Sequence, residues 1–143
     1  MENKEVQMIC EMAGAFLIDR LNPEFIVLFG SFARGIHHDR SDVDLAFYAP
    51  NSNFSVYDIF LLAQELEELL GRKVDLIDIE MVSTVFKAQI FGYGMPIFVK
   101  DGNELDRYRM NALSMYTVLN EDRKVILKQI HESGTIYGDG YSD

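Results

Sequence analysis

The chain has 143 residues, a formal net charge of −10 and one cysteine, Cys10. This length suits one domain with one core, and the single cysteine excludes a disulfide within the chain and a zinc site built from cysteines. The acidic balance argues against stable nucleic-acid binding, because it leaves no basic surplus to displace counterions from phosphates.

The N-terminal residues favour a helix over residues 4–20. Acidic side chains interrupt the apolar ones, and no basic start precedes an unbroken apolar run. A signal peptide needs a basic start followed by an unbroken apolar core, and a membrane span needs a long unbroken apolar run. We therefore expect no membrane association and a cytoplasmic location.

The first expected strand covers residues 24–29, a β-branched and aromatic run that ends at Gly30. Ser31 would then open a short helix or turn. Such a junction suits a phosphate, because unpaired backbone N–H groups and the helix dipole both attract an anion. A Gly-Ser pair after a strand is more often only a turn. Gly30 and Ser31 are therefore candidate phosphate ligands whose support must come from elsewhere.

The second expected strand covers residues 42–48 and carries Asp42 and Asp44, which point to the same side because side chains alternate along a strand. Two converging carboxylates repel each other, and a divalent cation such as Mg²⁺ removes that penalty. Alternating acids can also simply be solvated. Ten residues separate Gly30-Ser31 from Asp42. We expect His37 and His38 in this interval to be solvated loop residues.

A helix over residues 56–70 is predicted by an apolar stripe, by Ser55 and Asp58 at its start and by Gly71 at its end. A third strand over residues 74–79 carries Asp75 and Asp78. Three positions separate these acids, so they lie on opposite faces and only one can join the first two. The alternation alone leaves both open.

The rest of the chain predicts a helix over residues 84–91, a strand over 96–100 and a long helix from residue 103. We expect the long helix to pack across the sheet, with binding of a partner helix as the alternative. Polar residues 120–122 are a candidate interruption. The expected fold class is α/β, a mixed sheet flanked by helices. Residues 1–133 would form one domain, and residues 134–143 a flexible tail.

Taken in order, Gly30-Ser31, Asp42-Val-Asp44 and a later acid on a strand resemble the nucleotidyltransferase superfamily that includes DNA polymerase beta. The segments GSFARG and RSDVDL and the short chain are similar to the minimal nucleotidyltransferases (MNT), the antitoxin partners of HEPN ribonuclease toxins. The resemblance covers residues 20–100 and implies the polymerase beta-like fold. It also favours Asp75 over Asp78, because Asp75 is the first acid of the VDLID sequence.

The resemblance implies a division of roles among the candidate residues. Asp42, Asp44 and Asp75 would be the catalytic, metal-binding acids. They would hold two Mg²⁺ ions on the triphosphate of ATP, the substrate. The implied nucleotide-binding residues are Gly30, Ser31, Arg34, Arg40 and Ser41. Metals between three carboxylates can stabilise both the attacking oxygen and the leaving pyrophosphate.

The function implied by the resemblance is that of an antitoxin nucleotidyltransferase. It would transfer AMP from ATP to a tyrosine hydroxyl of a cognate HEPN toxin and form a hetero-oligomer with that toxin. One alternative is a small-molecule adenylyltransferase of the aminoglycoside type, which the absence of an added acceptor domain disfavours. A second is an antitoxin that acts by binding alone, which the presence of all three acids disfavours.

Overall fold

The computed structural model describes residues 4–38 and 40–132, with residues 121–132 as backbone alone. Four strands form one sheet in the order β3-β2-β1-β4. β1 (Phe25–Phe29) runs antiparallel to both β2 (Val43–Tyr48) and β4 (Met95–Val99), while β3 (Val74–Asp78) runs parallel to β2. The predicted mixed sheet is therefore confirmed, and the expected 134–143 tail lies outside the described residues.

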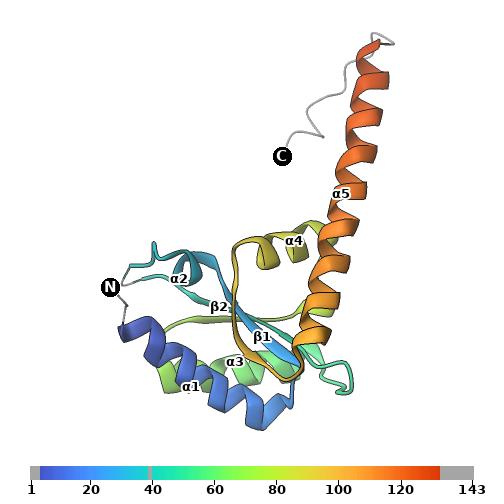
Figure 1. The fold of residues 1–143 in the computed structure, drawn as a ribbon. Helices are drawn as coiled ribbons and strands as arrows, with labels where there is room; N and C mark the ends of the chain where they lie inside the picture. The colour runs from blue at the N-terminus through green and yellow to red at the C-terminus, as the bar shows by residue number, and fades with distance from the viewer. Residues whose placement is uncertain (1–3, 39, 133–143) are drawn as a thin grey trace.

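Helices cover both faces of the sheet (Figure 1). One face carries α1 (Lys4–Leu21) and α3 (Val56–Leu70), and the other carries α4 (Thr84–Tyr93) and the start of α5 (Gly102–Glu132). A five-residue helix, α2 (Gly30–Arg34), follows β1 directly, and a short 3₁₀ helix, η1 (Ile79–Met81), follows β3. The chain thus forms three layers, with the sheet in the middle.

Alternation along β1 and β2 explains the two cores. Ile26, Leu28 and Leu45 pack towards α1 and α3, whereas Phe25, Val27 and Ala46 pack towards α4 and α5. Every side chain of β1 is buried, as expected for a central strand covered on both faces. Asp44 is two positions from Ala46 and so shares its face, which places the one acidic side chain of β2 on the α4 side of the sheet.

The boundaries of α3 follow from its predicted capping residues. The Ser55 hydroxyl accepts a hydrogen bond from the Asp58 backbone N–H, and the Asp58 carboxylate accepts one from the Ser55 N–H, both at 3.0 Å. Gly71 ends the helix with a left-handed backbone. The capping box and the C-terminal glycine are therefore confirmed.

The predicted packing of the last helix is wrong in part. Leu105, Tyr108 and Ala112 contact the sheet-facing core, but Met115 is 59% exposed and Leu119 is 38% exposed. α5 continues without interruption to Glu132 and extends away from the sheet (Figure 1). Helix-favouring residues around the polar segment 120–122 maintain the helix there, since polar residues alone do not break one.

Gly94 lets β4 approach β1 where α4 ends. A Cβ at this position would lie 2.3 Å from the Ile90 carbonyl oxygen and 2.6 Å from Val27 Cγ1. Gly92, two residues earlier, has nothing within 4 Å of such an atom. The two glycines therefore form a matched pair in which only one is required by packing.

We expect Gly94→Ala to lower the free energy of unfolding by about 2 kcal/mol or more, because backbone atoms must move to admit the methyl group. Gly92→Ala should leave stability unchanged or raise it by up to about 1 kcal/mol, because alanine favours the helix. Urea denaturation of both variants measures the difference. Equal stability of the two would show that β4 can shift freely against β1.

Candidate functional site

The carboxylate of Asp44 lies directly against the backbone of Gly30. A Cβ at Gly30 would be 2.1 Å from Asp44 Oδ2, and the Gly30 backbone has a φ of +74°. Both facts require glycine, one by space and the other by conformation. The antiparallel register places Phe29 opposite Asp44, which brings the end of β1 to this carboxylate. The Gly-Ser motif and the Asp-x-Asp motif therefore meet at one point.

The third acid lies on the neighbouring strand. Asp75 of β3 is in register with Asp44 of β2 in a parallel pair. Burial raises the pKa of Asp44 to about 6, with further contributions from the negative charges of Asp75 and then Asp42. The three predicted acids are thus close enough for two of them to change the pKa of the third.

Asp78 has a different position and partner. Its Oδ1 accepts a hydrogen bond from the Glu80 backbone N–H at 3.0 Å and so caps η1. Its register partner on β2 is Phe47, whose side chain belongs to the opposite core. Of the two acids that alternation left open, Asp75 is the one beside Asp44.

Gly30 and Ser31 form the first turn of α2, and the N-cap residue Phe29 offers no side-chain acceptor to its backbone N–H groups. Arg34 ends this helix, and its guanidinium carbon lies 5.1 Å from the ring centre of Tyr93. Gly30, Arg34 and Tyr93 line a cavity of about 370 Å³ between α2 and α4. A phosphate at the start of α2 would therefore lie beside a cavity with a cationic wall.

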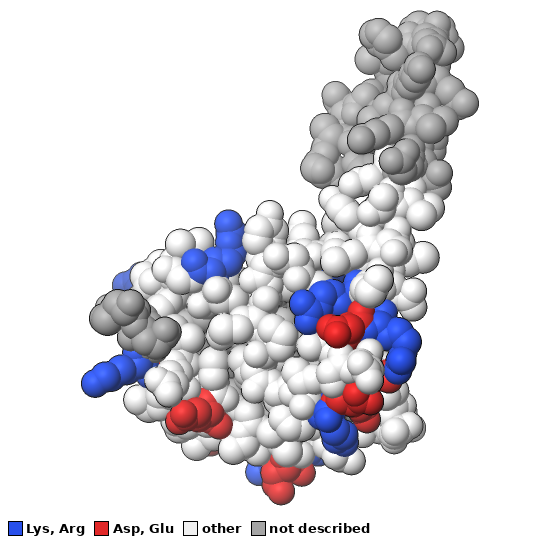
Figure 2. Space-filling view, viewed as in Figure 1, with Lys and Arg blue, Asp and Glu red and all other residues white. Residues whose placement is uncertain are grey.

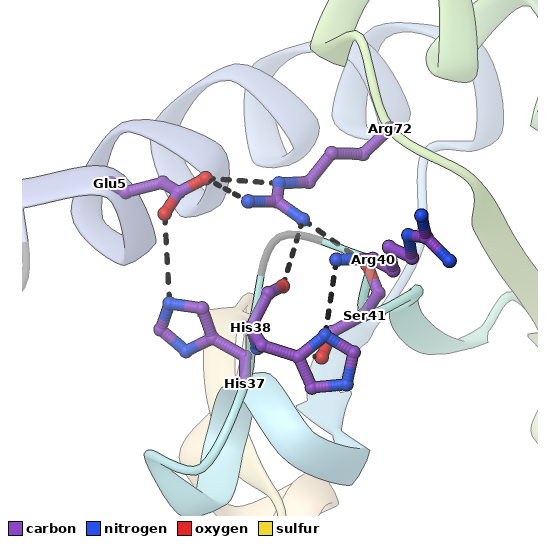
Figure 3. A network of polar contacts seen from close by, with 6 residues as sticks. All are labelled: Glu5, His37, His38, Arg40, Ser41 and Arg72. Atoms are coloured by element: carbon purple, nitrogen blue, oxygen red, sulfur yellow. Dashed lines mark hydrogen bonds and ion pairs between the residues drawn. The ribbon is translucent and has the colours of Figure 1, made fainter.

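The remaining two predicted ligands lie in the turn before β2. The Ser41 hydroxyl accepts a hydrogen bond from the His38 backbone N–H at 2.8 Å, and the Arg40 backbone N–H donates one to His38 Nδ1 at 3.1 Å (Figure 3). The Arg40 side chain is exposed and makes no ion pair with another described residue. These contacts give Ser41 and Arg40 a part in turn structure and do not join them to Gly30.

The prediction that both histidines are solvated is wrong for His37. Its side chain is only 10% exposed, and its ring stacks on Phe32 at a centroid distance of 4.1 Å. Its Nε2 lies 3.6 Å from Glu5 Oε1. Contacts from α1 and α2, which no local pattern reveals, cover the ring, whereas His38 is exposed as expected.

The donor set fits a divalent cation. Burial, and then the negative charges of Asp75 and Asp42, raise the pKa of Asp44, so a nearby cation would favour its ionised form. Among the described residues, no group of three or more acidic, histidine or cysteine side chains is arranged so that it could hold a metal ion. The fit therefore rests on the chemistry of the carboxylates, which are hard oxygen ligands of the kind that suits an ion with water and substrate oxygens as its further ligands.

Comparisons with known proteins agree with this geometry. The sequence matches the family described as polymerase beta, nucleotidyltransferase, over residues 13–103. The protein adenylyltransferase MntA of Shewanella oneidensis is 32% identical over 110 residues, which cover 75% of this chain and 76% of that protein. The chain belongs to the polymerase beta-type nucleotidyltransferase family.

Solved structures confirm the predicted fold class. A crystal structure of a toxin–antitoxin with AMP-PNP matches with a TM-score of 0.76 and 28% identity, over 85% of this chain and 98% of that chain. A structure of tri-AMPylated Shewanella oneidensis HEPN toxin in complex with MNT antitoxin matches with a TM-score of 0.72 and 25% identity. That match covers 88% of this chain and 98% of the other.

The raised pKa of Asp44 predicts a pH-dependent stability in the absence of divalent cations. The folded protein binds the proton of the Asp44 carboxyl group more tightly than the unfolded chain does. The stabilisation that this proton gives is therefore complete below about pH 4 and disappears as pH rises through about 6. Asp44→Asn avoids that loss. At pH 7.5 the variant should be more stable than the wild type, on the order of 1 kcal/mol after allowance for solvent screening.

Denaturant unfolding between pH 4 and pH 8, in a chelating buffer, measures this difference. Asp19→Asn is the control, because its carboxylate is 83% exposed. An Asp44→Asn difference that stays constant over the pH range, or a wild type that is more stable at pH 7.5, would contradict the electrostatic account of the cluster.

Proposed function

We propose that this protein is an antitoxin that transfers AMP from ATP to a tyrosine hydroxyl of a HEPN ribonuclease toxin and thereby neutralises it. The observation that carries the proposal is the meeting of Gly30, Asp44 and Asp75 at one point. The similarity to the adenylyltransferase MntA and to toxin–antitoxin structures supports the same substrate and partner.

Gly30 and Ser31 would bind the outer phosphates of ATP through the backbone N–H groups of α2 and the serine hydroxyl. Glycine at position 30 allows the phosphates to come near the backbone without displacing the Asp44 carboxylate. Arg34, beside the cavity, would add positive charge to the triphosphate. Arg40 and Ser41 would order the turn that precedes the acids and contribute to nucleotide binding from there.

Asp42, Asp44 and Asp75 would hold two Mg²⁺ ions, which neutralise charge on the attacking and leaving oxygens when bound. The tyrosine oxygen would form a bond to the α-phosphorus while the bond to the bridging oxygen breaks and pyrophosphate leaves. Asp75 is exposed at the edge strand β3, where it would orient the incoming hydroxyl and accept its proton.

The proposed partner is a protein, held in a hetero-oligomer in the cytoplasm. Exposed apolar side chains of α5 offer a surface for this partner; they include Met115, Val118 and Leu119. None of the helices in the described part of the chain is long and apolar enough to cross a membrane. On the face seen in Figure 2, basic and acidic side chains of the described residues are interspersed, which does not suit nucleic acid.

Transfer of AMP can be measured directly on the toxin. Co-incubation of a HEPN partner with this protein, ATP and Mg²⁺ should add whole AMP units to its intact mass, and Asp42→Ala with Asp44→Ala should abolish them. The acids are needed because neutralisation of the triphosphate charge dominates this kind of reaction. A toxin that remains inhibited and bound without any added mass would replace this proposal with inhibition by binding alone.

A second comparison separates the two acids of β3. Asp75→Asn should reduce the transfer rate about 100-fold or more, as expected for loss of a general base or a metal ligand. Asp78→Asn, which retains an oxygen to cap η1, should keep nearly full activity. Initial rates at saturating ATP decide the assignment, and the reverse order of effects would exclude Asp75 as the third acid.

A further inference from the structure

One arginine outside the predicted site residues connects the segment that precedes Asp42 to the rest of the fold. Arg72 Nη1 donates hydrogen bonds to the carbonyl oxygens of His38 and Ser41, both at 3.3 Å (Figure 3). Its Nε donates to Glu5 Oε2 at 2.9 Å, and Nη2 bonds the same carboxylate. A single guanidinium therefore joins the first turn of α1 to both ends of the turn before β2.

Ring contacts enclose the same group. The Arg72 guanidinium carbon lies 4.9 Å from the ring centre of Phe32, while His37 stacks on Phe32 at 4.1 Å. Glu5 connects Arg72 with His37, since its Oε2 accepts the Arg72 hydrogen bonds and its Oε1 lies 3.6 Å from His37 Nε2. The Arg72 side chain is only 14% exposed, so solvent screens these contacts far less than it screens a surface pair.

Backbone contacts connect the turn that Arg72 bonds to the predicted acids Asp42 and Asp75. Ser41 immediately precedes Asp42, and the next residue, Val43, donates its N–H to the Lys73 carbonyl oxygen at 2.9 Å. Lys73 follows Arg72 in the chain, so the guanidinium and this bond hold the start of β2 against the start of β3 at two points. In the chain, Asp42 lies between Ser41 and Val43, the two residues that these bonds hold, and Asp75 lies two residues after Lys73.

We propose that Arg72 is a positioning residue of the nucleotidyltransferase reaction. It holds the turn from His38 to Ser41 so that Asp42 reaches the cation site formed with Asp44 and Asp75. This inference rests on the proposed function for its effect on catalysis, but the ordering of the turn is a property of the fold. Asp42 needs such help because it is exposed and precedes the hydrogen-bonded part of β2.

Lysine cannot replace arginine in this arrangement. Arginine presents a planar fork with donors in several directions, whereas lysine is a single point charge. Arg72→Lys keeps the charge near Glu5 but cannot bond the carboxylate and two carbonyl oxygens together. The substitution therefore separates the positioning of the turn from the net charge of the site.

Hydrogen exchange and cation binding test the proposal on the full-length protein. We expect Arg72→Lys to increase amide exchange at residues 36–43 while α3 and β1 keep their protection. We also expect it to weaken Mn²⁺ binding in the presence of ATP about 10- to 100-fold, the range found when a support of a metal ligand is lost. Mass spectrometry reports the exchange, and titration calorimetry reports the affinity.

Arg20→Lys is the matched control. Arg20 also bonds a carboxylate, Glu65 Oε1 at 2.6 Å, and also lies over a ring, Phe16 at 4.6 Å, but it contacts no backbone of the turn. It should leave both readouts at wild-type values. If Arg72→Lys behaves as Arg20→Lys does, with exchange and Mn²⁺ affinity unchanged, the proposal is overturned.

Two further outcomes are also decisive. If Arg72→Lys does not fold, Arg72→Gln keeps a planar donor to one carbonyl oxygen and is measured in the same way. If the wild type itself binds no Mn²⁺ with ATP, the proposed function fails, and the exchange at residues 36–43 alone decides whether Arg72 orders the turn.

Discussion

The close approach of Gly30 to the Asp44 carboxylate is the constraint on which the rest of the site depends. It requires β1 and β2 to be antiparallel neighbours with Phe29 opposite Asp44, and it leaves no space for a side chain at position 30. The same contact brings the start of α2 to the acids. In the proposed reaction, a phosphate bound to the backbone there would therefore lie next to the acids.

This arrangement has an energetic cost that the fold tolerates. Asp44 is half-buried between two other carboxylates, and its pKa is raised to about 6. The neighbours of Asp44 along β2, Val43 and Leu45, are buried and apolar and pack on the opposite face of the strand. Those contacts hold β2 in register against the repulsion.

The predictable and unpredictable parts of the molecule differ in the range of the interactions that produce them. Strand and helix periods, the Ser55–Asp58 capping box and the meeting of the two motifs follow from residues near one another in the chain. Alternation alone left Asp75 and Asp78 open; the family resemblance favoured Asp75, and the register between β2 and β3 places Asp75 opposite Asp44. The role of Arg72 was missed because its partner Glu5 is 67 positions away and no local signal marks it.

The described side chains of α5 after Ala112 include several exposed apolar ones. Asp75 is exposed on β3, an edge strand, so in the proposed reaction an incoming hydroxyl would approach it without crossing the core. That reaction would also require a protein acceptor to be held in place. α5 has 31 residues; of its described side chains, those of Leu105, Tyr108 and Ala112 contact the sheet-facing core, whereas Met115 and Val118 are exposed. Because burial of such side chains favours association, Met115 and Val118 would suit contact with the toxin in the proposed complex, at a distance along the chain from the acids that would carry the chemistry.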